Sequence, residues 1–214
     1  MRKDPLINGH VYHVFTKSIA GYEIFRADKD YERMIELMKY YKYSKPHIKY
    51  SAYIKLKNKD KVIKELESKK RLVDIVAYCI MPTHLHFVLV QLVDKGITIY
   101  MKNILNSYTR YFNEKNNRKG PLWQSRFKSV LVENDEYLLH LTRYIHLNPT
   151  SSNLVNNPAD WKYSSYNEYL GRVDERLCNF SSYLDIEPTF YKNFVEEWQE
   201  DQRSLAILKS MMLE

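Results

Sequence analysis

The stretch "RLVDIVAYCIMPTHLHFVLVQL" (residues 71–92) decides how this chain folds. Residues 71–81 and 84–92 are strongly apolar and rich in residues that favour β-strands. A short connection with a proline, "MPT", separates them, so the stretch predicts two strands joined as an antiparallel hairpin. The second strand begins "HLHF", which places two imidazoles two positions apart on an apolar strand.

The segments on either side of this hairpin complete a recognisable order of elements. Alternation predicts strands over 10–19 and 126–133, and helical periodicity predicts helices over 28–44, 96–116 and 134–148. The first six elements then follow the order β-α-β-β-α-β, which is the ferredoxin-like arrangement. We therefore expect an α+β fold in which an antiparallel sheet carries helices on one face.

Helix boundaries and buried faces follow from local signals. Asp28 or Asp30 is the expected N-cap of the first helix, and Thr98 is the candidate cap of the second. The third helix starts with Asn-Asp-Glu at 134–136 and is expected to stop at Pro149. The buried stripe of the second helix is predicted to comprise Ile99, Met101, Ile104, Leu105, Tyr108 and Phe112.

Two segments stand apart from this core. Residues 45–71 are rich in charge, with one helical pattern around Val62, Ile63 and Leu66, and are expected to form a largely exposed insertion. Its lysines could contact DNA, although a solvated face is the favoured reading. We divide the chain into a main domain, residues 1–150, and a helical extension packed on it, residues 151–214, which includes segments 161–171 and 187–214.

Composition limits the class of protein. The chain has 214 residues and no apolar run of about 18 residues, so we expect no membrane span. Its N-terminus lacks an apolar signal core, and two cysteines are too few for a disulfide framework, so we expect a cytoplasmic protein with reduced thiols. The net charge of +7, with 19 tyrosines and 3 tryptophans, suits single-stranded nucleic acid but also fits a basic enzyme.

The two histidines are the first candidate for chemistry. In a strand, residues i and i+2 point to the same face, so His84 and His86 project together. Two neutral imidazoles on one face can share a divalent cation. The alternative is a structural pair satisfied by hydrogen bonds, which is the more frequent meaning of an isolated His-x-His.

The helix over 134–148 offers the partners such a site would need. Tyr144 and Asn148 are spaced i, i+4 and share one helical face, whereas His146 points away and is interpreted as structural or surface. Asparagine supplies a carbonyl oxygen to a metal, and tyrosine supplies a nucleophilic phenol. From spacing alone, a core aromatic residue is the favoured interpretation of Tyr144. On the preceding helix, Tyr108 falls on the buried stripe, whereas Tyr111 could approach the site.

A basic and aromatic cluster opens the fourth strand. Trp123, Gln124, Arg126 and Lys128 could contact DNA through stacking and phosphate pairing, although Trp123 could instead close the core. Further phosphate-contact candidates are Arg118, Lys119 and Arg143.

These blocks resemble a known family. "AYCIMPTHLHFVLV" (77–90) resembles the histidine–hydrophobic–histidine (HUH) motif of single-tyrosine transposases. The blocks "PLWQSRFKSVLVENDEYLLHLTRYIHLNP" (121–149) and "WKYSSY" (161–166) resemble those of REP-associated tyrosine transposases and their insertion-sequence relatives. The resemblance runs from about residue 10 to about residue 170, and the order of several blocks agrees.

The resemblance implies an activity and a set of roles. The family cuts single-stranded DNA beside hairpins and rejoins it through a 5′-phosphotyrosine intermediate, with Mg²⁺ or Mn²⁺ held by two histidines and a polar side chain. Here it implies Tyr144 as the nucleophile and His84, His86 and Asn148 as metal ligands; asparagine at 148 favours the REP-associated branch. It further implies a bacterial or archaeal, nucleoid-associated protein, monomeric or homodimeric.

Two other functions remain open from the residues. A hydrolytic metallonuclease would use water as the nucleophile while Tyr144 only packs. A regulator without catalysis would bind hairpin DNA and leave it uncut, although the intact histidine pair argues against this reading. An unperturbed phenol has a pKa of about 10, so a nucleophilic tyrosine needs help to lose its proton.

Overall fold

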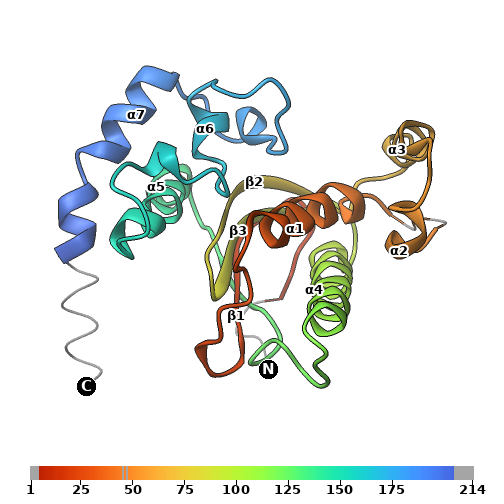
Figure 1. Ribbon diagram of the computed structural model, residues 1–214. Coiled ribbons are helices and arrows are strands. Elements are labelled where there is room, and N and C mark those ends of the chain that lie inside the picture. Colours follow the sequence, from red (N-terminus) through yellow and green to blue (C-terminus); the bar gives the residue numbers. More distant parts are fainter. Residues whose placement is uncertain (1–4, 45, 47, 205–214) are drawn as a thin grey trace.

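The core of the protein is a four-stranded antiparallel sheet, seen in a computed structural model that describes residues 5–44, 46 and 48–204. Its strands are β1 (Val11–Lys17), β2 (Val73–Ile80), β3 (His84–Gln91) and β4 (Lys128–Leu131), in the spatial order β2-β3-β1-β4 (Figure 1). This is the order that a β-α-β-β-α-β unit gives when its first and third strands lie at the centre. The predicted ferredoxin-like α+β fold is confirmed.

The hairpin that decides the fold forms as expected. Met81 and His84 exchange backbone hydrogen bonds across Pro82 and Thr83, which closes a two-residue turn between β2 and β3. The Pro82 carbonyl accepts the backbone N–H groups of Ile24 and Phe25, so the turn is also tied to the chain after β1. The strand β2 is buried along its whole length, as its continuous apolar run predicts.

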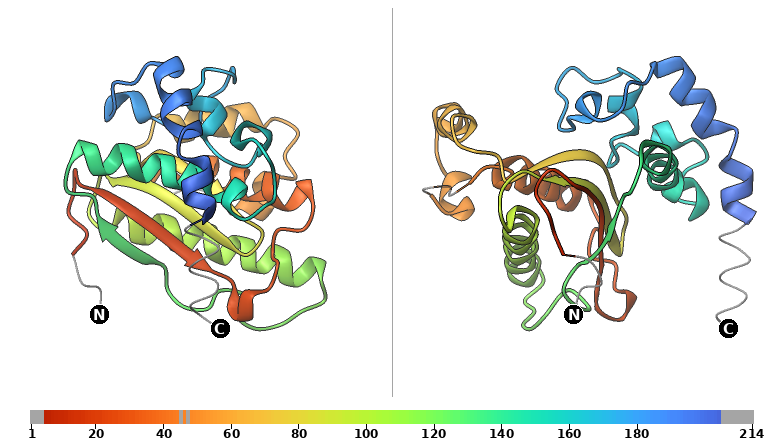
Figure 2. Two further views of the ribbon diagram at one scale, coloured as in Figure 1. Left: turned by 90° about the vertical axis from the view of Figure 1, so that its left-hand side faces the viewer. Right: turned by 180° about the vertical axis from the view of Figure 1, so that it is seen from behind.

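Helices cover both faces of the sheet, not one. Helix α4 (Gly96–Lys115) packs against β2 and β3 on one face, and α1 (Asp28–Tyr41) packs beside α4. Helix α5 (Asp135–Ser151) packs against β2 and β3 from the opposite face (Figure 2). Within the described ranges, α5 lies over β2 and β3 and not over the half of that face formed by β1 and β4.

The predicted caps of the first two helices are wrong. The N-cap of α1 is Ala27, and the carboxylate of Asp30 accepts its backbone N–H three positions back. The N-cap of α4 is Lys95, a left-handed residue at φ 57°, not Thr98. Gly96 follows because a Cβ there would lie 2.2 Å from the Leu72 carbonyl oxygen, which leaves no room for any other residue.

Two details of the predicted helices also change. Ile99 is 40% exposed, so it does not belong to the buried stripe of α4, which Ile97 and Tyr100 join instead. The helix α5 does not stop at Pro149 but continues to Ser151. Only a half-turn follows the proline, and the Thr150 and Ser151 hydroxyls both donate to the Leu147 carbonyl, which compensates for the weakened last turn.

The insertion holds two short helices, α2 (Tyr50–Tyr53) and α3 (Lys59–Glu67). The predicted helical pattern is confirmed, because Val62 and Leu66 are buried on α3. The segment is largely exposed, as expected. Tyr50 is nonetheless buried and packs edge-on against Tyr40 of α1, 5.2 Å between ring centroids. These tyrosines hold the insertion against α1.

The C-terminal part packs on α5 and on the outer edge of β2. It contains short turns of helix and α7 (Pro188–Glu196), and residues 199–204 are helical; the last ten residues of the expected 187–214 segment lie outside the described part. Both cysteines are buried free thiols, as expected. Within the described ranges, no helix is long and apolar enough to cross a membrane.

Candidate active site

The two histidines share one face of the sheet with residues of β1. In the β1–β3 ladder, Phe15 pairs with His86 and Lys17 pairs with His84, so all four side chains project from the same face. This is the face that α5 partly covers. Strand parity and the packing of α5 therefore put both imidazoles on the same side of the sheet as the helix that carries Tyr144 and Asn148.

Each histidine uses one ring nitrogen inside the protein. The Nδ1 atom of His86 lies 3.1 Å from Nε2 of His13 on β1, and the two rings stack with centroids 5.3 Å apart. The Nδ1 atom of His84 lies 2.9 Å from the Thr83 hydroxyl. In both residues Nε2 has no partner among the described residues, which leaves it for a ligand.

Burial keeps these imidazoles neutral. It lowers the pKa of His13 to about 4 and that of His86 well below its usual value of 6.5. The pKa of His84 falls to about 4, chiefly through burial and further through the charge of Lys17. At neutral pH each ring therefore has one unprotonated nitrogen with a free lone pair, which is the form that binds metals.

Tyr144 reaches the histidines from α5. Its ring stands at 89° to that of His86, with the two centroids 6.0 Å apart. The side chain is 40% exposed, so it is accessible from solvent and is not the core aromatic residue that its helical spacing allowed. Partial burial nonetheless raises the pKa of the phenol, and no cationic side chain in the described part of the chain offsets this shift.

Asn148 lies one turn further along the same face of α5. It is 8% exposed, and its Nδ2 atom is buried without a hydrogen-bond partner in the described structure. Leaving a buried amide unsatisfied costs about 1–3 kcal/mol, so such a group calls for an explanation. A half-turn of the amide exchanges its nitrogen and oxygen, which would put a carbonyl oxygen in the same place.

The donor set fits a divalent cation. Two imidazoles and one carbonyl oxygen are ligands that Mn²⁺ accepts. A role as a ligand would account for the unsatisfied buried amide of Asn148. No three His, Cys, Asp or Glu side chains converge as a metal-binding group in the described ranges, so a third ligand of that kind is absent there. The assignment of His84, His86 and Asn148 as ligands remains a prediction.

A buried histidine fixes the position of α5. The ring of His146 binds Tyr191 of α7 through Nδ1 (2.6 Å) and Ser165 through Nε2 (2.8 Å). Ser165 in turn bonds the backbone of Tyr78 on β2. The "WKYSSY" block thus joins the edge of β2 to the helix that carries Tyr144. His146 is structural, one of the two roles expected for it.

Four of the candidate DNA contacts lie at the surface. Gln124, Arg126, Lys128 and Lys119 are exposed. Lys128 pairs with Phe15 in the β1–β4 ladder, so it projects from the same face as the histidines. The backbone N–H of Gln124 donates to the Lys17 carbonyl, which places this loop at the end of β1 nearest His84.

The other three candidates are engaged within the protein. The Trp123 indole donates to the Leu105 carbonyl and the Thr109 hydroxyl of α4, so this ring closes the core beneath the loop. The Arg118 guanidinium donates to Asn113 at the end of α4 and to the Pro121 carbonyl of its own loop. The Arg143 guanidinium lies between the rings of Phe194 and Trp198, 4.2 and 4.3 Å from their centroids.

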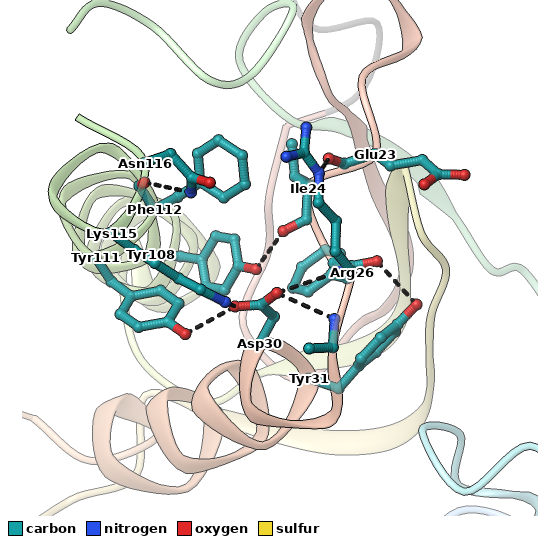
Figure 3. A network of polar contacts seen from close by, with 12 residues as sticks. Glu23, Ile24, Arg26, Asp30, Tyr31, Tyr108, Tyr111, Phe112, Lys115 and Asn116 are labelled. Atoms are coloured by element: carbon teal, nitrogen blue, oxygen red, sulfur yellow. Dashed lines mark hydrogen bonds and ion pairs between the residues drawn. The ribbon is translucent and has the colours of Figure 1, made fainter. Parts of the chain in front are cut away.

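The competing tyrosines belong to the opposite side of the sheet. Tyr108 is buried and donates to the Ile24 carbonyl, as its place on the stripe predicts. Tyr111 donates to Asp30, between α4 and α1 (Figure 3). Because α5 and the histidines occupy the other face, the expectation that Tyr111 could approach the site is wrong.

Three residues near the histidines escaped sequence reasoning. His13, Thr83 and Lys17 all contact or adjoin the pair. Thr83 precedes His84 and could have been found from its position alone. His13 and Lys17 depend on the register between β1 and β3, which no local pattern specifies.

With this geometry in place, comparison with known proteins gives the family. Residues 29–148, more than half of the chain, match the family described as IS200-like transposases. The chain belongs to this transposase family.

One relative and one solved structure agree with that membership. The relative is a Haemophilus influenzae (strain ATCC 51907 / DSM 11121 / KW20 / Rd) protein provisionally named a REP-associated tyrosine transposase. It is 32% identical over 104 residues, 44% of this chain and 58% of the relative's length. The structure, a REP-associated tyrosine transposase bound to a REP hairpin, covers 87% of this chain and 98% of its own with a TM-score of 0.54. At 16% identity, that likeness supports the fold alone.

Proposed function

We propose that the protein is a single-tyrosine DNA strand transferase that cleaves single-stranded DNA beside a hairpin and rejoins it. The observation that carries the proposal is the position of Tyr144, whose ring stands 6.0 Å from that of His86 while its side chain stays open to solvent. Family membership and the hairpin named for the solved relative support the choice of substrate.

The proposed step is a transesterification at phosphorus. The Tyr144 oxygen loses its proton and forms a bond to the scissile phosphorus, while the bond from phosphorus to the 3′ oxygen breaks. The 3′ oxygen takes up a proton and leaves as a hydroxyl, and the 5′ phosphate stays on the tyrosine. Rejoining reverses these bonds, so the energy of the phosphodiester is kept and no nucleotide cofactor is needed.

A divalent cation, Mg²⁺ or Mn²⁺, would be held by His84, His86 and Asn148. When bound, such an ion supplies Lewis-acid polarisation of the phosphate. Among the described residues, no cation lowers the pKa of the Tyr144 phenol, and partial burial raises it. The protein's own contribution is therefore to hold the phenol beside the imidazoles on a helix fixed by His146.

We place the DNA strand over the half of the site face formed by β1 and β4. Lys17 and Lys128 project from this half, and Arg126 lies on the adjoining loop. Cations along an open path suit a phosphate backbone, because phosphate contacts supply most of the affinity for single strands. Trp123, Arg118 and Arg143 are weaker candidates, since their polar groups are already bonded or stacked within the protein.

The test is a covalent adduct. Wild-type protein incubated with a single-stranded hairpin oligonucleotide and Mn²⁺ is expected to give a protein–DNA species that survives denaturation. Tyr144→Phe should abolish it, whereas Tyr137→Phe, which alters an equally exposed tyrosine two turns earlier on α5, should not. Cleavage without an adduct would indicate a hydrolytic nuclease, and tight binding without cleavage a regulator; either result contradicts the proposal.

A further inference from the structure

His13 is the residue nearest to His86 that the proposed chemistry does not use. Its Nε2 atom lies 3.1 Å from Nδ1 of His86, and Phe15 packs against both rings, 4.9 Å from His13 and 6.1 Å from His86 between centroids. The contact joins the half-buried imidazole of His13 to the buried imidazole of His86 across neighbouring strands, 73 residues apart in sequence. It is therefore a specific product of the fold.

We propose that His13 is a positioning residue that accepts the Nδ1 proton of His86 and so holds His86 in the tautomer whose Nε2 binds the divalent cation. The inference rests on the proposed function, because it concerns the metal site of that reaction.

The argument begins with the number of protons in the contact. Two neutral imidazoles facing each other through one nitrogen each can place only one hydrogen between them. If His86 donates it, Nε2 of His86 keeps a lone pair and can bind a metal. If His13 donates it, Nε2 of His86 carries the hydrogen and cannot. The hydrogen bond made at one ring nitrogen thus decides what the other can do.

The surroundings favour donation by His86. With its hydrogen on Nδ1, His13 Nε2 is the acceptor, and the outer nitrogen of His13 can be solvated because that residue is only partly buried. In the reverse arrangement the hydrogen on Nε2 of His86 would find no acceptor among the described residues, on a side chain that is 8% exposed. A donor with no protein acceptor on a largely buried side chain is disfavoured, because only solvent can satisfy it there.

Without His13 the preference disappears. A phenyl ring at position 13 would still fill the space beside Phe15 but could accept nothing from Nδ1 of His86. The metal-competent tautomer would then bury an unsatisfied N–H group. Loss of such an outer-shell partner typically weakens metal affinity about 10–100-fold.

The experiment reads the tautomer directly, in metal-free protein. Ring ¹⁵N chemical shifts of histidine-labelled wild type at neutral pH are expected to show His86 mainly protonated on Nδ1. In His13→Phe the population protonated on Nε2 should rise. His13→Gln, whose side-chain oxygen can accept the same hydrogen, should restore the wild-type pattern. His10→Phe is the matched control, because His10 is exposed and its ring contacts only the Asn8 carbonyl among the described residues.

Binding of Mn²⁺ supplies the second readout. Calorimetric titration of the same proteins is expected to give a Kd about 10–100-fold higher for His13→Phe, with His13→Gln and His10→Phe close to wild type. The inference is overturned if His86 in wild type is protonated on Nε2, or if His13→Phe changes neither tautomer nor affinity. It is also overturned if affinity falls without any tautomer change, because His13 would then bind the metal itself. None of these readouts needs DNA, so a missing adduct would contradict the proposed function and leave this result standing.

Discussion

The ring of Tyr144 stands perpendicular to that of His86, with the centroids 6.0 Å apart, although the two residues come from elements on separate parts of the chain. This relationship joins a phenol open to solvent to a buried imidazole. The β2–β3 hairpin and helix α5 therefore contribute to one shared site.

Asn148 should limit the stability of the protein. Replacing it with leucine removes a buried amide that lacks a partner, so the free energy of unfolding is expected to rise by about 1–3 kcal/mol. The same change removes a proposed ligand, so Mn²⁺ affinity and adduct formation should both fall. Urea unfolding and calorimetry measure the two effects. A loss of stability would mean that the amide is satisfied in solution and is not kept for a ligand.

His146 should make stability depend on pH. Burial lowers the pKa of His146 from 6.5 to about 3, so below pH 6.5 the unfolded chain binds a proton that the native ring refuses. Stability is therefore complete above pH 6.5 and declines as the pH falls toward 3. His146→Gln is expected to be less stable than wild type at neutral pH, with the difference narrowing in acid. Urea unfolding at several pH values tests this, and a gap that stays constant would count against it.

Asp30 should matter for stability and not for chemistry. Its buried carboxylate accepts hydrogen bonds from Tyr111, Lys115 and the backbone before α1 (Figure 3). Burial alone would raise the pKa of Asp30, but these partners lower it overall, so the group is charged. Asp30→Ala is expected to cost about 2–4 kcal/mol of unfolding free energy, because its partners are left unsatisfied.

The control for Asp30 lies two residues away. Asp28 pairs with Lys162 at the surface, so Asp28→Ala should destabilise much less. For both variants the adduct yield per folded molecule should equal that of wild type, since α1 covers the face opposite the histidines. A specific loss of activity in folded Asp30→Ala protein would show that the two faces are coupled.

Lys128 should contribute a phosphate contact. Its side chain is exposed on the site face, so Lys128→Ala is expected to weaken single-stranded DNA binding at low salt. The slope of log affinity against log salt should fall by about 0.7, the share of one contact on a single strand. Lys102→Ala, on the exposed surface of α4, should leave the slope unchanged. Equal slopes for both variants would contradict a phosphate contact at Lys128 and a DNA path over β4.

Local patterns in the sequence predicted the candidate site residues better than the contacts that position them. The alternation of β3 put His84 and His86 on one face of the sheet, and the i, i+4 spacing on α5 put Tyr144 and Asn148 on one face of that helix. Both are short-range geometric rules. That α5 covers the histidine face could not be read locally, because it depends on how the "WKYSSY" block binds β2. His13 escaped for the same reason, since its contact needs the β1–β3 register.

The central claim is that Tyr144 is the nucleophile. The most direct test is to digest the denatured protein–DNA adduct and identify the modified peptide by mass spectrometry. The proposal predicts a nucleotide 5′-phosphate on the oxygen of Tyr144 and unmodified peptides at Tyr111 and Tyr137. A nucleotide on any other residue, or cleaved DNA with no modified peptide, would contradict it.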